Sequence, residues 1–209
     1  MKQKITYRLL QLVAALLLAP ASTWAWSGSG TSVDPFILMS EADLQGLATN
    51  VNAGNYDAEA VYVELGGDIA CTGTFTTPIG QYDDHPFSGQ FDGKGYTITG
   101  MSLTKDGDYV GLFGYIARSI HFSSTQPNPA VKNLTISGAT ITSTGSNAAA
   151  LAGYILNGSV DNVTVSNTNI VTNGSIEKSN IGGVIGYIQS GSVTNVTVKG
   201  VVVNNAEPA

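Results

Sequence analysis

The sequence has 209 residues, with nine basic and fifteen acidic side chains and a net charge of −6. This length permits one domain with a substantial core. The shortage of basic residues excludes a surface that neutralises nucleic acid or anionic lipid. The single cysteine, Cys71, excludes an intramolecular disulfide, and we interpret it as a small buried hydrophobic residue.

The first 25 residues have the pattern of a secretory signal peptide. Basic residues at positions 2, 4 and 8 precede an apolar run from Leu9 to Ala19, and small residues follow up to Ala25. The run is too short for a membrane-spanning helix, which needs about 20 residues. We expect cleavage after Ala25, or alternatively after Ala21, and a secreted or cell-surface protein without stable membrane insertion. The remaining chain has six basic and fifteen acidic residues, a net charge of −9.

Residues 26–39 are predicted to form a linker or leader, and residues 40–54 a short helix. Ser40 is a candidate N-cap, and Asp43 follows three residues later as an imperfect capping box. Apolar side chains then recur at the spacing of one helical face, at Leu44, Leu47, Ala48 and Val51. We expect this helix to cover the N-terminal end of the domain that follows.

Residues 55–209 have the composition of short strands separated by turns. Val61, Val63 and Leu65 alternate with polar residues, as in a half-buried strand. Asp92-Gly93 and Lys94-Gly95 predict a tight turn. After it, Tyr96, Ile98, Met101 and Leu103 are expected at strand positions.

One motif then occurs three times, as GLFGYI from Gly111, ALAGYI from Ala150 and GVIGYI from Gly183. Each copy is followed by a second phrase, VKNLTISGATI, VDNVTVSNTNI or VTNVTVKGVVV. A repeat of 20 to 50 residues predicts a solenoid, in which each unit buries its apolar face against its neighbours. The repeated structural positions are Gly111, Gly114, Tyr115, Asn133, Gly153, Tyr154, Asn162, Gly183, Gly186, Tyr187 and Asn195.

Equivalent residues of successive repeats should stack at the strand spacing of about 4.8 Å. We expect a Tyr row, an Asn row and a Thr row, with the asparagines in left-handed turns and the threonines facing outwards. Residues 118–130 lengthen the first repeat and are expected to form a loop. The last strand ends in NNAEPA, so its edge should be exposed. Either the chain is a fragment of a longer protein, or Glu207 and Pro208 guard this edge; we favour the fragment.

The phrases GLFGYI and GVIGYI, with the upstream PFSGQFDGKGYTITGMSL, resemble the GLUG-motif family of bacterial surface proteins. The opening GSGTSVDPFILMSEADLQGLA is similar to the leader before such repeats. The resemblance covers about residues 28–203 and implies an all-β fold, a right-handed parallel β-helix. Its members are adhesins or stalks beside IgA-cleaving metalloprotease domains. The second copy departs from the pattern, with Ala150 and Ala152 at family positions for Gly and Phe. The resemblance supplies no catalytic residues.

The candidate chemical sites are few. Residues 82–85, Tyr-Asp-Asp-His, could form an acid–base or metal site, but a solvated loop is the preferred interpretation. Asp106 and Asp108 could contribute to a Ca²⁺ site, although a turn is favoured because Ca²⁺ needs six to eight oxygens. No H-E-x-x-H motif occurs, and residues 120–176 contain only Lys132 and Asp161 as charged side chains. We therefore expect no catalytic residue, cofactor or metal.

The predicted function is that of a secreted or cell-surface adhesin or stalk. Its partner would be an extracellular glycan or a host or neighbour-cell protein, bound through the stacked Thr, Asn and Tyr rows, with further repeats or domains following in a longer chain. Two alternatives remain open. One is a polysaccharide-degrading lyase or glycosidase, and the other is the non-catalytic stalk of a larger surface protease.

Overall fold

The computed structural model describes residues 26–73, 75–82, 84–172 and 180–205, which include most of the predicted repeat region. The predicted signal peptide and the C-terminal guard residues lie outside the described residues. None of the helices within the described residues has the length and apolar character needed to cross a membrane.

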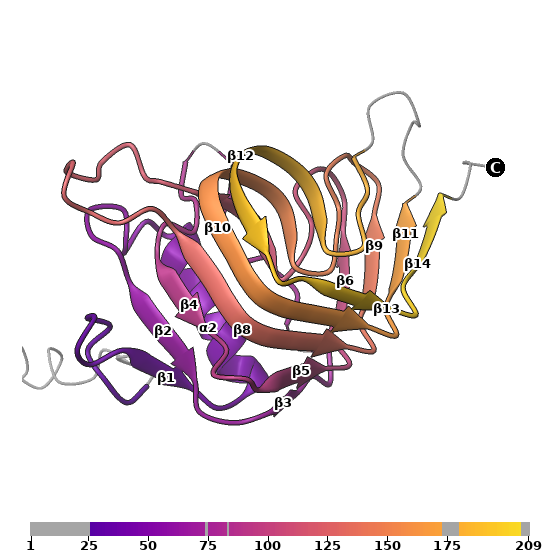
Figure 1. Ribbon diagram of the computed structural model, residues 1–209, viewed down its shortest axis with the longest axis horizontal. Helices are drawn as coiled ribbons and strands as arrows, with labels where there is room; N and C mark the ends of the chain where they lie inside the picture. Colours follow the sequence, from indigo (N-terminus) through magenta and orange to yellow (C-terminus); the bar gives the residue numbers. More distant parts are fainter. Residues whose placement is uncertain (1–25, 74, 83, 173–179, 206–209) are drawn as a thin grey trace, which may run out of the picture.

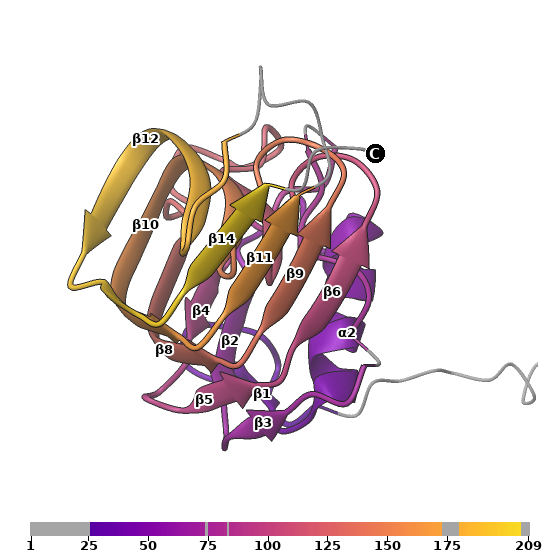
Figure 2. The same cartoon turned by 90° about the vertical axis from the view of Figure 1, so that its right-hand side faces the viewer.

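The described chain is mostly β, with one helix, and its named strands pair in parallel within two sheets (Figure 1). The larger sheet has the order β1 (Phe36–Leu38), β2 (Tyr62–Leu65), β4 (Gln90–Asp92), β8 (Ala130–Ser137), β10 (Ala152–Ser166), β12 (Ile185–Thr194). Four further strands join it: β3 (Ile69–Ala70), β5 (Thr97–Thr99), β7 (Phe113–Ala117) and β13 (Thr197–Lys199). Figure 2 shows the second sheet as a separate layer of β6 (Ser102–Lys105), β9 (Thr140–Ser143), β11 (Asn169–Thr172) and β14 (Val202–Asn205).

Equivalent residues of successive repeats lie in register. Phe91 pairs with Val131, Val131 with Val160, and Val160 with Val193. The first three side chains are at most 1% exposed, and they belong to one hydrophobic core that runs through the stacked strands. Apolar residues at every second strand position point inwards, so the alternation in the sequence becomes a continuous buried row.

Helix α2 spans Glu41–Asn52, with Ser40 as its N-cap. The Ser40 hydroxyl accepts a hydrogen bond from the Asp43 backbone N–H at 3.2 Å. The Asp43 carboxylate in turn accepts from the Ser40 hydroxyl and from the backbone N–H of Met39. The apolar face of the helix is buried in the core.

One buried carboxylate fastens α2 to the segment after β3. Glu41, only 6% exposed, accepts hydrogen bonds from the backbone N–H groups of Thr72 at 2.7 Å, Gly73 at 3.0 Å and Phe75 at 2.9 Å. The Thr72 hydroxyl adds a fourth bond at 3.0 Å. At the other end of the helix, the Asn52 amide bridges Pro78 and Gly80.

Two local expectations were wrong in detail. The predicted linker contains β1, which pairs in parallel with β2, so residues 36–38 belong to the sheet. Tyr96 and Met101 lie just outside β5 and β6. The tight turn predicted after Asp92 is present: the Tyr96 N–H donates to the Gly93 carbonyl oxygen at 2.8 Å, with Lys94 at φ 54° and Gly95 at φ 85°.

The repeated glycines allow close approach between repeats. A Cβ on Gly153 would lie 2.6 Å from the Asn147 carbonyl oxygen, and one on Gly186 would lie 2.6 Å from the Gly153 carbonyl oxygen. Because both clashes are with backbone atoms, side-chain rotation cannot relieve them. Glycine therefore sets how closely these segments stack.

Among the residues that the structure describes, the third repeat packs against the second and has no further strand on its other side. Val165 is fully buried, but Val198, its pairing partner in β13, is 51% exposed. Likewise, Ile170 is 0% exposed, whereas Val203, its pairing partner in β14, is 46% exposed. The exposed edge expected from the sequence is therefore present along β13 and β14.

Candidate functional site

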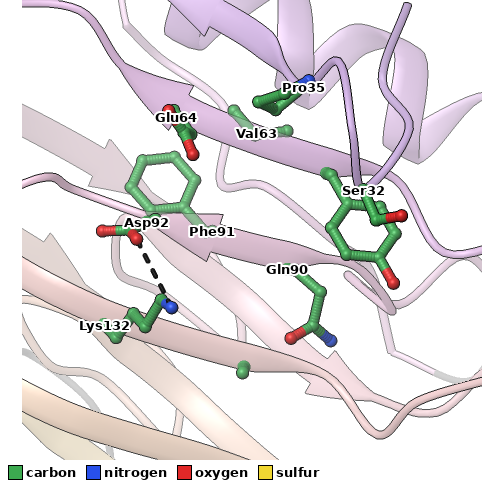
Figure 3. Close-up of a pocket in the computed structure, with 10 residues that line it drawn as sticks. Ser32, Pro35, Val63, Glu64, Gln90, Phe91, Asp92 and Lys132 are labelled. Carbon is green, nitrogen blue, oxygen red and sulfur yellow. Dashed lines mark ion pairs between the residues drawn. The ribbon is translucent and has the colours of Figure 1, made fainter.

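The candidate site is a polar groove on the outer face of β2, β4 and β8 (Figure 3). Its volume is about 240 Å³. Strand register places Glu64 beside Asp92 and Asp92 beside Lys132, so one row across three strands carries three charged groups. Gln90 lies on β4 two residues before Asp92 and therefore on the same face.

The charges in the groove are arranged in pairs. Lys132 Nζ lies 3.4 Å from Asp92 Oδ2, and Lys94 Nζ lies 3.5 Å from Glu64 Oε2. Partial burial raises the pKa of Asp92, but this effect is outweighed by hydrogen bonds from the Asn133 amide and the Lys94 backbone N–H and by the charge of Lys132. Together they hold the pKa of this carboxyl below its ordinary value. Asp92 is therefore an ionised hydrogen-bond acceptor at neutral pH.

A loop that departs from the repeat pattern lies beside the groove and holds one of its side chains. Gln90 Nε2 donates a 2.7 Å hydrogen bond to the carbonyl oxygen of Asn128, in the loop between β7 and β8. Arg118 donates to the carbonyl of Ser123, and its guanidinium lies 5.8 Å from the centre of the Phe122 ring. Figure 1 shows this loop projecting beside the N-terminal loops. In repeat proteins such insertions often lie on the binding face.

A second, larger hollow of about 460 Å³ adjoins the groove. Its lining includes the aromatic rings of Phe36, Tyr56 and Tyr62, together with the carboxylate side chain of Glu59. Gln126 lies on the inserted loop, and its Oε1 accepts a hydrogen bond of 3.2 Å from the backbone N–H of Ala60. The hollow is thus built from the leader, the segment before β2 and the inserted loop.

The Asn row occupies strained corners of the repeats. Asn133, Asn162 and Asn195 have φ values of 54°, 53° and 53°, in the left-handed region. The Asn162 amide donates to Asn133 Oδ1 at 2.9 Å, and Asn133 donates to Asp92 at 2.9 Å. Asn195 instead donates to Asp161 at 2.8 Å. These amides bind one another or neighbouring carboxylates, and the row reaches the groove only at Asp92.

The Tyr row is part of a larger aromatic cluster. Tyr115 pairs in register with Tyr154 and Tyr154 with Tyr187, with ring centroids 5.0 and 5.1 Å apart. Tyr82 and Tyr109, which the repeat pattern does not include, stack on each other at 4.7 Å and contact the row edge-on. Tyr115 is only 4% exposed, so much of the cluster is packing.

The other sequence candidates have structural contacts. Asp106 accepts from the Thr144 hydroxyl, and Asp108 accepts from the Ser146 backbone N–H, so both carboxylates join one loop to the equivalent loop of the next repeat. In the part of the chain that the structure describes, no group of three or more His, Cys, Asp or Glu side chains could hold a metal ion.

The acid–base cluster suggested at residues 82–85 lies only partly within the described residues. His85 Nδ1 lies 2.6 Å from Asp57 Oδ2, and Asp83 lies outside the described residues. Cys71 is half-buried; burial, followed by the nearby Glu41 carboxylate, raises the pKa of its thiol to about 11. It is therefore a poor nucleophile at neutral pH.

The groove is not visible in the local sequence pattern. Glu64, Asp92 and Lys132 come from segments about 30 to 40 residues apart and become neighbours through strand register. Two signals could have pointed to them. Asp92, Lys132 and Asp161 each directly follow an apolar residue, Phe91, Val131 or Val160, and the loop at 118–130 interrupts the regular spacing.

Comparison with known proteins gives two relatives. A Gly-rich membrane protein of Evansella cellulosilytica is 34% identical over 157 residues, which cover 70% of this chain and 16% of that protein. Halomucin of Haloquadratum walsbyi is 32% identical over 158 residues, which cover 69% of this chain and 2% of halomucin. The chain thus spans only a small part of the length of the relatives that it matches.

No family model matches the sequence. Among solved structures, a Bacteroides ovatus protein described as an immunoglobulin A1 protease has a TM-score of 0.42 and 14% identity. The match covers 85% of this chain and 79% of that one.

Proposed function

We propose that the protein is an exported, cell-surface module of the GLUG-repeat type, folded as a right-handed parallel β-helix, that binds a neutral glycan in the groove over β2, β4 and β8. Glu64, Gln90, Asp92 and Lys132 hydrogen-bond sugar hydroxyls, and Tyr62 offers an aromatic surface to the C–H face of a sugar ring. The module acts as an adhesin and makes no chemical change to its ligand.

The row of acceptors and donors in the groove carries this proposal. Carboxylate, amide and ammonium groups converge on one hollow from adjacent rigid strands, so their relative positions are fixed before a ligand arrives. Small-molecule sites are concave and combine apolar walls with a few placed polar groups. The side chains of Phe91 and Val63 are buried in the core, so the apolar surface of this groove comes from Pro35 and the ring of Tyr62.

The charges favour a neutral ligand. Lys132, which lines the groove, already faces Asp92, and Lys94 already faces Glu64, so neither lysine is an unpaired cation for an acidic sugar. The chain as a whole is acidic, with a net charge of −6. Long-range repulsion therefore disfavours anionic polysaccharides such as pectins. The relatives, one named as a membrane protein and one as a mucin, support a surface location.

A glycan array with the mature protein, followed by calorimetric titration of the hits, tests the proposal. The array carries neutral β-glucans, mannans and chito-oligosaccharides, with polygalacturonate as the acidic comparison. Gln90→Ala should weaken binding about tenfold or more, because one good hydrogen bond to a ligand contributes about 1–2 kcal/mol. Ser159→Ala, two strands away in the same row as Gln90, is the matched control and should bind normally.

Other outcomes identify other functions. Absence of binding above background would overturn the glycan proposal and leave the role of a stalk or spacer. Loss of binding in Thr164→Ala but not in Gln90→Ala would move the ligand to the stacked Thr row. Release of shorter sugars during incubation, lost in Asp92→Asn, would instead indicate a glycosidase, since Glu64 and Asp92 are carboxylates on adjacent strands.

A further inference from the structure

The groove and the larger hollow form one elongated depression. Ser32 and Tyr62 line both of them, so the two hollows adjoin at these two residues. Tyr62 lies on β2, is half-buried and lines both hollows. Figure 3 shows Ser32, the other residue that lines both, at the opposite end of the groove from Glu64 and Asp92.

The leader lines both parts. It supplies Ser32 and Pro35 to the groove and residues 29–32 to the larger hollow. In the inserted loop, the Asn128 carbonyl holds the Gln90 side chain of the groove, and the Gln126 side chain lines the larger hollow. The leader therefore continues along both parts, and the inserted loop supports the first and borders the second.

The two parts differ in chemistry. The groove presents charged and amide groups over short parallel strands, whereas the larger hollow presents the rings of Phe36, Tyr56 and Tyr62. Phe36 and Tyr56 have centroids 6.3 Å apart and support each other in a tilted pair. Burial raises the pKa of the Tyr56 hydroxyl, so this ring is a neutral surface across the physiological pH range. Such rings suit the apolar faces of sugars, and the groove suits their hydroxyl edges.

We infer that the protein recognises the interior of a linear, neutral glycan rather than a chain end. One sugar unit lies in the groove, one lies in the larger hollow, and the linking unit crosses Tyr62. This inference rests on the proposed function and extends it to a substrate class, a straight unbranched chain of neutral sugars.

The test is calorimetric titration with cello-, manno- and chito-oligosaccharides of one to five units. In the wild-type protein, the tetrasaccharide of the bound series should bind at least tenfold more tightly than the disaccharide. Tyr56→Ala should reduce this gain to about twofold and leave disaccharide affinity unchanged within twofold. Glu59→Ala changes an exposed side chain in the same hollow. It should also reduce the gain in affinity from disaccharide to tetrasaccharide, but by less than Tyr56→Ala. Tyr96→Ala, an exposed tyrosine outside both parts, is the control.

The outcomes distinguish failure of this inference from failure of the proposed function. Disaccharide binding that depends on Gln90, with no gain for longer chains, would overturn this inference and leave the proposed function intact. Equal tetrasaccharide affinity in Tyr56→Ala, Glu59→Ala and Tyr96→Ala would also overturn it. Failure of every oligosaccharide to bind would overturn both proposals. If the Tyr56→Ala protein does not fold, the tetrasaccharide and disaccharide affinities of Glu59→Ala decide whether the larger hollow binds sugar.

Discussion

Replacement of Glu41 by glutamine should detach helix α2 from the segment that it holds. The wild-type carboxylate uses Oε2 for the backbone N–H and hydroxyl of Thr72, and Oε1 for the N–H groups of Gly73 and Phe75. A glutamine has only one oxygen. If that oxygen accepts from Gly73 and Phe75, the glutamine NH₂ group faces Thr72. The Thr72 hydroxyl can rotate and accept a hydrogen bond from this NH₂ group. The Thr72 backbone N–H is itself a donor, so its bond is lost.

The expected loss in the free energy of unfolding can be estimated from these hydrogen bonds. Net contributions are about 1.5–3 kcal/mol for hydrogen bonds to charged groups and about 0.5–1.5 kcal/mol for neutral ones. The variant loses one bond, weakens two others, and loses a favourable charge at the first turn of the helix, worth about 0.3–1 kcal/mol. Thr72 and Gly73 are exposed, so water can compensate part of the loss. We expect Glu41→Gln to lower the free energy of unfolding by about 2–3 kcal/mol, and Glu41→Ala by about 4 kcal/mol.

Urea unfolding followed by circular dichroism measures this change. Glu59→Gln removes the same charge from an exposed loop position and should alter stability by no more than about 0.5 kcal/mol. Hydrogen exchange should in addition show the amides of α2 opening first in Glu41→Gln. If Glu41→Gln and Glu59→Gln are equally stable, the four bonds do not hold the helix and the reasoning fails.

Three further variants or treatments test the packing and the thiol. Gly153→Ala should destabilise by about 3 kcal/mol in thermal unfolding, because its Cβ would lie 2.6 Å from a backbone oxygen. Gly67→Ala, whose nearest atom would be a side-chain carbon at 3.7 Å, should be tolerated, and equal losses would refute the close-approach argument. Asn162→Ala should lower the free energy of unfolding by about 2 kcal/mol, because it loses a hydrogen bond and places alanine at a left-handed φ of 53°. Asn162→Gly loses only the hydrogen bond and should lower it by about 1 kcal/mol. A glycine variant less stable than the alanine variant would contradict this reasoning. Cys71, with its pKa raised to about 11 from 9.0, should react with iodoacetamide about 100-fold more slowly than a free thiol at pH 8. Its rate should rise between pH 9 and 11, and Glu41→Gln should raise it at every pH in that range; rapid labelling at pH 7 would refute the assigned environment.

The repeat region and the helix could be read from local pattern. Apolar side chains at helical spacing from Leu44 to Val51 are buried on one face of α2, as a 3.6-residue period requires. Val160, Val163 and Val165 alternate with polar residues and are buried in β10. In both cases the periodicity that generates the burial is a property of consecutive residues, so a single sequence contains the information.

Details that depend on distant segments were not predictable in this way. The leader was expected to be a linker, but residues 36–38 form β1 because the edge of β2 is available for pairing. Tyr82 joins the Tyr row across 33 residues of sequence to Tyr115, although no repeat pattern includes it. Pairing partners of this kind are specified by the packing of whole segments.

The sequence by itself determined the strand-forming repeats, the helix with its Ser40 cap, and the left-handed asparagines at the corners. Each of these follows from backbone preference and side-chain spacing over a few residues. Only the tertiary structure decided that Glu64, Asp92 and Lys132 form one row, that the leader lines the groove beside it, and that the inserted loop holds Gln90 there. Parallel register places residues about 30 to 40 positions apart at the spacing of adjacent strands, about 4.8 Å. The groove is therefore a product of how the strands stack.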